Sequence, residues 1–146
     1  MNEELIRNAV RRRFLAASGI NPLTQFKEQG KKLDTSNLAV FAAEYLISGE
    51  KRSFTNKRSG VKTFMIQYDF YVPSGSGFGA AETMRAAVED EFDLSDPEKS
   101  RVAVTGYDVN LNTVKISRKE SSPFDSIQML FTFSVMESPA AETRTL

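Results

Sequence analysis

The stretch VKTFMIQYDFYV, residues 61–72, decides the fold of this chain. Its side chains alternate between an apolar set and a mostly polar set. The apolar set is Phe64, Ile66, Tyr68, Phe70 and Val72. The alternate set is Thr63, Met65, Gln67, Asp69 and Tyr71. This period of two predicts an antiparallel strand with one face buried and one face exposed.

The regions that flank this strand predict a hairpin and a helix. Residues 38–47 also alternate and predict a partner strand, and residues 48–60 form a polar, basic hairpin loop between the two. On the other side, Pro73 ends the strand and a glycine-rich turn follows. A helix is then expected to run to about Phe92, with Ala81, Met84, Val88 and Phe92 on one stripe.

Another helix is predicted near the start of the chain. Its apolar residues recur at helical spacing: Leu5, Ile6, Ala9, Val10 and Phe14. Asn2 is the expected N-cap, and Ser18-Gly19 the expected stop. The run Arg11–Arg13 is expected to close the helix at its negative end as a solvated basic face. Residues 20–37 are expected to form a long irregular connection.

The second half of the chain predicts further strands. Residues 102–111 indicate a strand with a kink near Gly106, and a partner strand is expected after Asn112. Residues 127–135 give a last alternating strand. The whole order indicates an α+β fold, an antiparallel (mixed) sheet of about four to six strands with two main helices packed on one face. One domain is expected over residues 1–136, with a flexible tail over 137–146.

The composition favours a binding protein over an enzyme. The chain has 146 residues, of which 40% are hydrophobic, which suffices for one ordinary core. It contains no Cys and no His, and so lacks the commonest general base and the commonest transition-metal ligands. We therefore expect no catalytic site, no metal and no cofactor. The longest apolar run, Leu38–Ala43, is too short to span a bilayer, and no signal peptide is visible, so a soluble protein is expected.

Charge is segregated along the chain although the formal net charge is zero. Residues 51–62 contain five basic residues and no acid, whereas residues 82–98 contain seven acids and one Arg. Segments of opposite sign can set the register of a head-to-tail assembly. The candidate interface or lumen residues are Lys51, Arg52, Lys57, Arg58, Glu89, Asp90, Glu91 and Asp93. Two solvated loops of unlike sign are an equal alternative.

The turn Gly75–Gly79 is the strongest candidate ligand site. With Ala80 it satisfies G-x-G-x-x-A between a strand and a helix, which is the setting of a dinucleotide-binding turn. That fingerprint belongs to a parallel βαβ unit, whereas this strand is expected in an antiparallel hairpin. A flexible strand-to-helix turn is favoured, and a small ligand-binding domain that uses this turn remains the alternative from another class.

A family resemblance covers nearly the whole chain. The run FMIQYDFYVPSGSGFGAAETMRAAVEDEF, residues 64–92, resembles the centre of the tail-terminator-like (tail-completion) proteins of long-tailed bacteriophages. Like that family, the chain has an amphipathic N-terminal helix with an exit of the ASGI type, residues 17–20, and ends on an alternating apolar strand. Many relatives carry a Trp-Pro-Asn-like element after the first helix. This chain has Asn21-Pro22 without a Trp.

The resemblance implies a tail-terminator-like fold and a structural role in a virion. Such a protein assembles as a ring, typically a hexamer, on the head-proximal end of the tail tube. Its partners would be copies of itself, the tail tube protein and a neck or head-completion protein, with DNA passing through the lumen. It would be made in the bacterial host cytoplasm and reside in the virion, with no membrane. The alternative within the same particle is another neck or head–tail adaptor protein.

Overall fold

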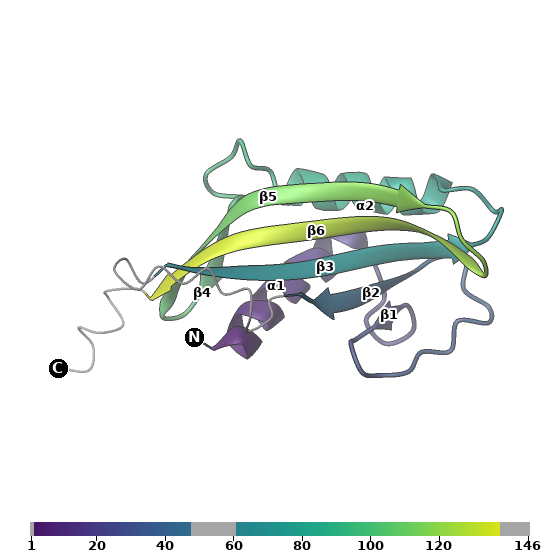
Figure 1. Cartoon of the computed structure of the whole chain (residues 1–146), viewed down its shortest axis with the longest axis horizontal. Coiled ribbons are helices and arrows are strands. Elements are labelled where there is room, and N and C mark those ends of the chain that lie inside the picture. The colour runs from purple at the N-terminus through teal and green to yellow at the C-terminus, as the bar shows by residue number, and fades with distance from the viewer. Residues whose placement is uncertain (1, 48–60, 138–146) are drawn as a thin grey trace.

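The computed structural model describes residues 2–47 and 61–137. In these residues two helices lie against one six-stranded sheet (Figure 1). The helices are α1 (Glu3–Ser18) and α2 (Gly79–Glu91). The strands are β1 (Phe26–Lys27), β2 (Phe41–Leu46), β3 (Lys62–Pro73), β4 (Arg101–Val104), β5 (Tyr107–Lys119) and β6 (Phe124–Glu137). The expected α+β class is confirmed.

The sheet has the strand order β1-β2-β3-β6-β5-β4. All neighbouring pairs are antiparallel except β1 and β2, so the sheet is mixed. The alternating stretch of residues 61–72 lies at the centre of this sheet, because β3 pairs along its whole length with β6 and also with β2. The expected hairpin between residues 38–47 and 61–72 is therefore present, although its loop lies outside the described residues.

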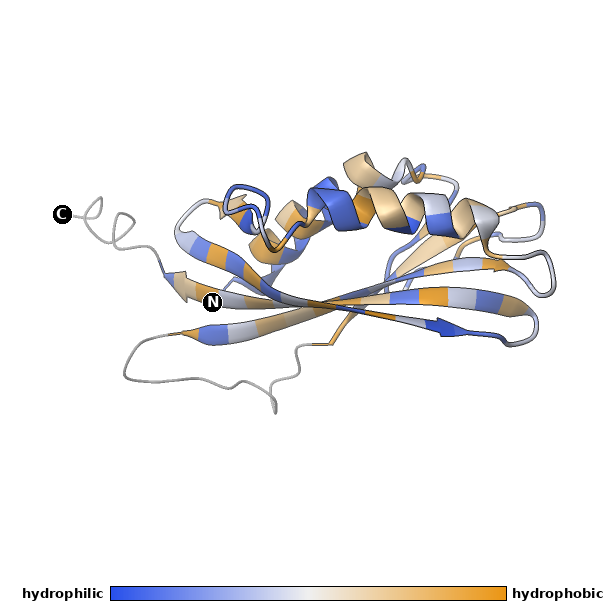
Figure 2. Cartoon of the chain, turned by 90° about the horizontal axis from the view of Figure 1, so that it is seen from above, coloured by the Kyte–Doolittle hydropathy of each residue, from blue (hydrophilic) through white to orange (hydrophobic). Residues whose placement is uncertain are grey.

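Both helices cover one face of the sheet, and the core lies between the two layers (Figure 2). The apolar set of β3 points into this layer, and all five of its side chains are buried. Phe14 of α1 stacks on Tyr68 of β3 with 3.9 Å between ring centroids, while Phe92 packs on Phe131 of β6 at 4.9 Å. Aromatic pairs of this kind supply much of the apolar contact between the helices and the sheet.

The ends of α1 follow from local sequence, but the role of its arginines does not. Asn2 accepts a hydrogen bond from the Leu5 N–H at 3.2 Å, and Gly19 caps the other end with a φ of 76°. A positive φ at the residue after a helix favours glycine, which has no Cβ to clash. The prediction that Arg11–Arg13 closes the helix is wrong, because the helix continues to Ser18 and its last turn contains no basic residue.

Two boundaries differ from the sequence prediction. Gly106, with a φ of 87°, does not kink one strand but lies in the turn of a hairpin between β4 and β5. The strand β5 then continues past Asn112 through a register shift between Leu111 and Thr113, where the sequence had suggested a second strand. Within the connection 20–37, the short strand β1 pairs in parallel with β2, and its Phe26 is buried against Phe14. Turns and bulges in strand-rich segments share the same residue signals, which explains the misplaced boundary.

Candidate assembly surface

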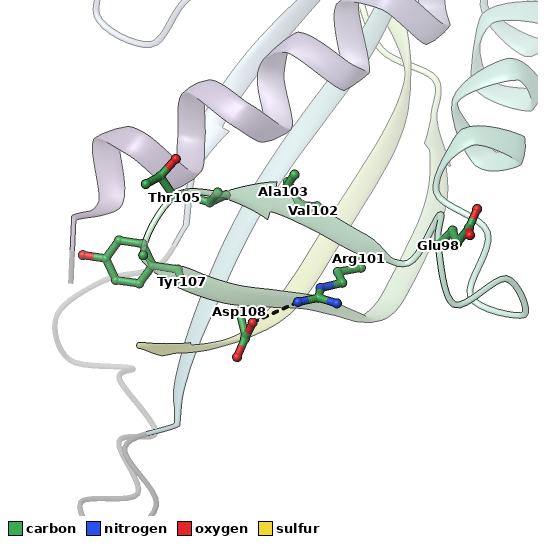
Figure 3. Close-up of a pocket in the computed structure, with 9 residues that line it drawn as sticks. Glu98, Arg101, Val102, Ala103, Thr105, Tyr107 and Asp108 are labelled. Carbon is green, nitrogen blue, oxygen red and sulfur yellow. Dashed lines mark hydrogen bonds and ion pairs between the residues drawn. The ribbon is translucent and has the colours of Figure 1, made fainter. Parts of the chain in front are cut away.

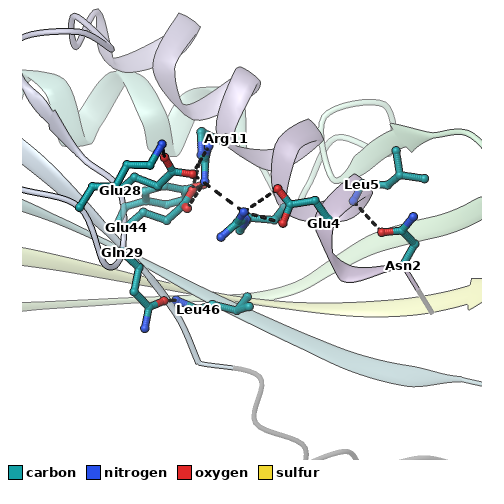
Figure 4. A network of polar contacts seen from close by, with 11 residues as sticks. Asn2, Glu4, Leu5, Arg11, Glu28, Gln29, Glu44 and Leu46 are labelled. Atoms are coloured by element: carbon teal, nitrogen blue, oxygen red, sulfur yellow. Dashed lines mark hydrogen bonds and ion pairs between the residues drawn. The ribbon is translucent and has the colours of Figure 1, made fainter.

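One flank of α1 carries a partly buried ionic network (Figure 4). Arg11 donates to both carboxylate oxygens of Glu44 on β2, at 2.9 and 2.5 Å. The Tyr68 hydroxyl donates to the same carboxylate at 2.9 Å, and Glu44 is only 1% exposed. The third guanidinium nitrogen of Arg11 lies 3.0 Å from Glu28. The network therefore fastens both β2 and the connection after β1 to the first helix.

The pKa shifts in this network follow from its hydrogen bonds and burial. The hydrogen bond to Glu44 raises the pKa of Arg11 above its ordinary value. Burial raises the pKa of Tyr68, and the neighbouring Glu44 raises it further. The hydrogen bond from Lys31 is the largest cause that lowers the pKa of Glu28. These directions leave Arg11 charged, Tyr68 neutral and Glu28 charged near neutral pH, so the network acts as a structural clamp.

The other flank of α1 holds the end of α2 through Arg13. Its guanidinium donates to the backbone carbonyls of Glu91, Lys99 and Arg101 at 2.6, 2.8 and 3.0 Å, respectively. It also lies over the Phe92 ring, with 4.5 Å from Cζ to the ring centroid. A cation at the C-terminal end of a helix is favoured by the helix dipole. Arg13 therefore joins α1, α2 and β4, and only Arg12 of the three arginines is exposed as expected.

The four predicted acidic residues all lie at the end of α2, but they differ in their surroundings. Glu89 pairs with Arg85, and Glu91 lies 3.4 Å from Arg13. Asp93 accepts two hydrogen bonds from Ser95, which lower its pKa. The Asp90 carboxylate has no hydrogen bond or ion pair with any described residue. The cations seen beside this segment thus come from α1, α2 and Lys99, whose ammonium group lies 3.3 Å from the Asp90 carbonyl.

The four predicted basic residues, Lys51, Arg52, Lys57 and Arg58, lie outside the described residues. Their expected pairing with the acidic segment stays a prediction.

The face of the sheet opposite the helices is not covered by any described helix (Figure 2). It presents the alternate side chains of the central strands, and most of them are polar and uncharged. From β3 and β6 these are Thr63, Met65, Gln67, Asp69, Tyr71, Ser126, Gln128, Leu130, Thr132 and Ser134. We call this the open face.

An aromatic cluster lies at one end of the open face. Phe41 of β2 stacks on Tyr71 of β3 with 5.0 Å between ring centroids. Phe124 of β6 meets Phe41 edge-on at 5.1 Å and Tyr71 at 6.2 Å. Phe41 is buried beneath its two neighbours, whereas Tyr71 and Phe124 are half-buried. Partly exposed aromatic residues are typical anchors of protein interfaces, so this cluster is a candidate contact surface.

A carboxylate without a cation lies beside the cluster. Asp69 accepts hydrogen bonds from Gln67 at 2.8 Å and from the Tyr71 hydroxyl at 3.1 Å. No described basic side chain makes an ion pair with it. Burial raises the pKa of Asp69, and the two hydrogen bonds oppose that rise. The Tyr71 hydroxyl also shares a hydrogen bond of 2.9 Å with Tyr45, so this polar network orients both tyrosines on the open face.

The glycine-rich turn is occupied by a carboxylate of the chain itself. The N–H of Gly75 donates to Asp125 at 3.2 Å, and the other oxygen of Asp125 accepts from the Ser121 N–H at 2.9 Å. The depression beside the turn, of about 380 Å³, is also lined by Glu120. A phosphate there would meet two carboxylates in place of cations, so the geometry disfavours phosphate binding at this turn.

A larger depression of about 580 Å³ lies along the β4–β5 hairpin (Figure 3). The pair Arg101 and Asp108, 3.1 Å apart, lies across the two strands. The Tyr107 hydroxyl, also at its wall, accepts a hydrogen bond from the Asn2 N–H at 2.8 Å and so ties the hairpin to the start of α1. Its lining shows no nucleophile paired with a base, so we assign it no chemistry.

Two further findings concern residues 2–47 and 61–137. In these residues no group of three or more Asp or Glu side chains is arranged so that it could hold a metal ion. Neither α1 nor α2 is long and apolar enough to cross a bilayer.

Comparison with solved structures relates this fold to a virion. A chain from the virion of a native gene transfer agent particle superposes with a TM-score of 0.55 and 15% sequence identity over 90% of this chain and 93% of that chain. The chain shares its fold with a component of a virion particle. A second solved structure, of a protein with no stated function, superposes with a TM-score of 0.65 and 17% identity over 95% of this chain and 99% of that one. No protein-family model matches the chain, and a search of curated proteins finds no match.

These likenesses, at identities this low, show the fold and not the residues of a site. They support the expectation that the chain has a fold found in a phage-like virion.

The sequence analysis did not identify the Glu44 clamp or the aromatic cluster. Glu44 did give a signal, since it is the one charged residue on the face that also carries Val40, Ala42 and Leu46. The cluster gave none, because its three rings come from separate strands.

Proposed function

We propose that this protein is a structural virion protein, a tail terminator that forms a ring, typically a hexamer, on the head-proximal end of a tail tube. In this role it acts by binding and not by catalysis. It stops tube polymerisation and presents a surface to a neck or head-completion protein. The observation that carries the proposal is the superposition with a chain of the gene transfer agent virion, which extends over nearly the full length of both chains.

Surface features of the described residues support an assembly role. No described helix covers the open face, whose side chains on the central strands are mostly half-buried, and the aromatic cluster of Phe41, Tyr71 and Phe124 lies on it. At the end of α2, Asp90 has an exposed carboxylate with no described partner. Head-to-tail rings need two different, complementary surfaces on each copy. The acidic end of α2 and the basic residues 51–58 have the opposite signs that such a contact uses.

The ring can be tested with purified full-length protein. Light scattering over a concentration series, together with negative-stain images, is expected to show closed rings whose formation weakens as salt is raised. Charge reversal by Lys57→Glu and Arg58→Glu is expected to weaken assembly by a salt-dependent amount. The matched control is Arg12→Glu with Lys32→Glu, which changes the charge equally at two exposed positions elsewhere.

The outcomes separate the alternatives. A protein that stays monomeric both alone and with tail tubes contradicts the ring. Binding to a head or neck protein with no effect on tube length favours another neck or head–tail adaptor. Tight binding of a nucleotide in calorimetry would favour a ligand-binding domain that uses the Gly75–Gly79 turn.

A further inference from the structure

The outer edge of β5 is unpaired over its second half. The strand β4 covers only the residues from Tyr107 to Asn110, and the N–H of Leu111 still bonds to the Ser100 carbonyl at 2.7 Å. From Asn112 to Lys119 no described strand pairs with this edge, although the opposite edge of β5 pairs with β6. Figure 1 shows β5 as the uppermost strand of the sheet over this stretch, with α2 behind it and no strand beyond it. A regular edge of this length presents a row of free N–H and C=O groups.

The side chains on this edge make it positively charged. Between Asn112 and Lys119 there are three cations, Lys115, Arg118 and Lys119, and no acid. Arg118 donates to Glu82 of α2 at 2.6 and 3.0 Å. Lys115 and Lys119 are exposed and have no ion pair with any described residue. The edge is therefore cationic, with two lysines that no described acid neutralises.

A shallow depression on the open face adjoins the same edge. It measures about 300 Å³, and its walls come from three neighbouring strands. They are Gln67 of β3, Lys115, Ile116 and Ser117 of β5, and Gln128 and Leu130 of β6. A strand laid beside β5 would direct every second side chain toward this depression. Lys115 at the wall is placed to pair with an acidic side chain, and Leu130 offers an apolar surface beneath it.

We propose that the β5 edge, residues 112–119, binds an extended acidic segment of a partner protein as an added strand. Main-chain pairing would supply affinity, and the depression with its lysine would supply specificity. Lysines on an edge discourage pairing with neutral or basic strands. A second copy of β5 would bring four lysines that no described acid neutralises to one seam, which disfavours self-pairing. The site goes beyond the proposed ring and stands whether or not the ring forms.

The test uses the full chain and a labelled peptide of alternating Glu and Thr. We expect saturable binding in fluorescence anisotropy, and weaker binding to a peptide of equal charge in which Pro replaces every Thr, because Pro cannot donate to the added pair. Lys115→Glu is expected to weaken binding at least ten-fold. Lys32→Glu, an exposed lysine elsewhere with no described partner, is the charge-matched control and is expected to weaken it less than two-fold.

Amide exchange followed by NMR distinguishes strand pairing from charge attraction. On peptide binding, alternate amides of residues 113–119 are expected to exchange at least ten-fold more slowly, while amides of β3 remain unchanged. Equal binding of the Pro peptide, equal loss with Lys32→Glu, or binding without alternate protection would overturn the proposal. Protection that rises with protein concentration in the absence of peptide would overturn it too, because it would assign the edge to a second copy.

Discussion

The two faces of the sheet are formed by the same strands but differ in the burial of their side chains and in the contacts that these make. On the covered face, Phe64, Phe131 and Phe133 are fully buried beneath the helices. On the open face, the residues one position away are polar or half-buried, and their contacts are hydrogen bonds and stacked rings. The period of two in each strand produces this division. The covered face therefore stabilises the molecule, and the open face, which no described helix covers, carries the contact surface that we propose for partners.

The two faces also differ in how each accommodates a carboxylate. Glu44 on the covered face is fully paired, with Arg11 and Tyr68 as partners. Asp69 on the open face has two neutral donors and no described cation. A buried charge needs a partner to be tolerated, and a buried carboxylate without a cation, such as Asp69, can take up a proton instead.

The largest effect is expected for Phe131→Ala. Its ring packs on Phe92 and Tyr68 with centroid distances of 4.9 and 6.0 Å, so its loss leaves a cavity between sheet and helices. The free energy of unfolding should fall by about 3–5 kcal/mol in urea denaturation. Leu130→Ala, the neighbouring position on the open face, is the control and should cost about 1 kcal/mol. Equal costs would contradict the assignment of the two faces.

Glu44→Gln comes next. It leaves Arg11 without its main buried partner, and the free energy of unfolding should fall by about 3 kcal/mol. Glu28→Gln removes the more exposed partner of the same arginine and should cost about 1 kcal/mol or less. Chemical denaturation of both variants measures the difference. A small effect of Glu44→Gln would mean that the clamp does not hold β2 to α1.

A smaller effect is expected for Tyr71→Phe on the open face. The change removes the hydroxyl that joins Asp69 to Tyr45 and keeps the ring contacts with Phe41 and Phe124. The free energy of unfolding should fall by about 1 kcal/mol. Because this hydroxyl donates to Asp69, its loss should also raise the pKa of that carboxyl further, which NMR titration can follow. An unchanged or lower pKa would show that the hydroxyl does not stabilise the charged form.

The pH dependence contributed by Asp69 should be the smallest and has a definite sign. Because its pKa in the folded protein is raised by burial, the folded state holds this proton more tightly than the unfolded chain does. Its contribution to stability is therefore greatest below about pH 4, the unfolded value, and decreases as pH rises to the folded pKa. Asp69→Asn should remove this part of the pH profile in denaturant titrations. A loss of stability on acidification that disappears in Asp69→Asn would reverse the sign and contradict the shift.

Local patterns predicted much of the fold but little of the candidate surface. The first helix, the central strands and the second helix were visible because each repeats its own period over many residues. The roles of Arg11 and Arg13 were not visible, because their partners lie on β2 and beyond α2. The pairing of β6 with β3 was equally hidden, since residues far apart in sequence meet there. The turn at Gly106 was misread as a kink because a glycine signals either feature.

The sequence by itself determined which side chains share a face, where the first helix begins and ends, and the α+β class. These features depend on residues within a few positions of one another, so they can be read from the order of the residues. The tertiary structure decided that β6 lies beside β3, that Glu44 is clamped by Arg11, and that β4 stops short along β5. Those features depend on contacts between distant segments, which form only when the chain folds.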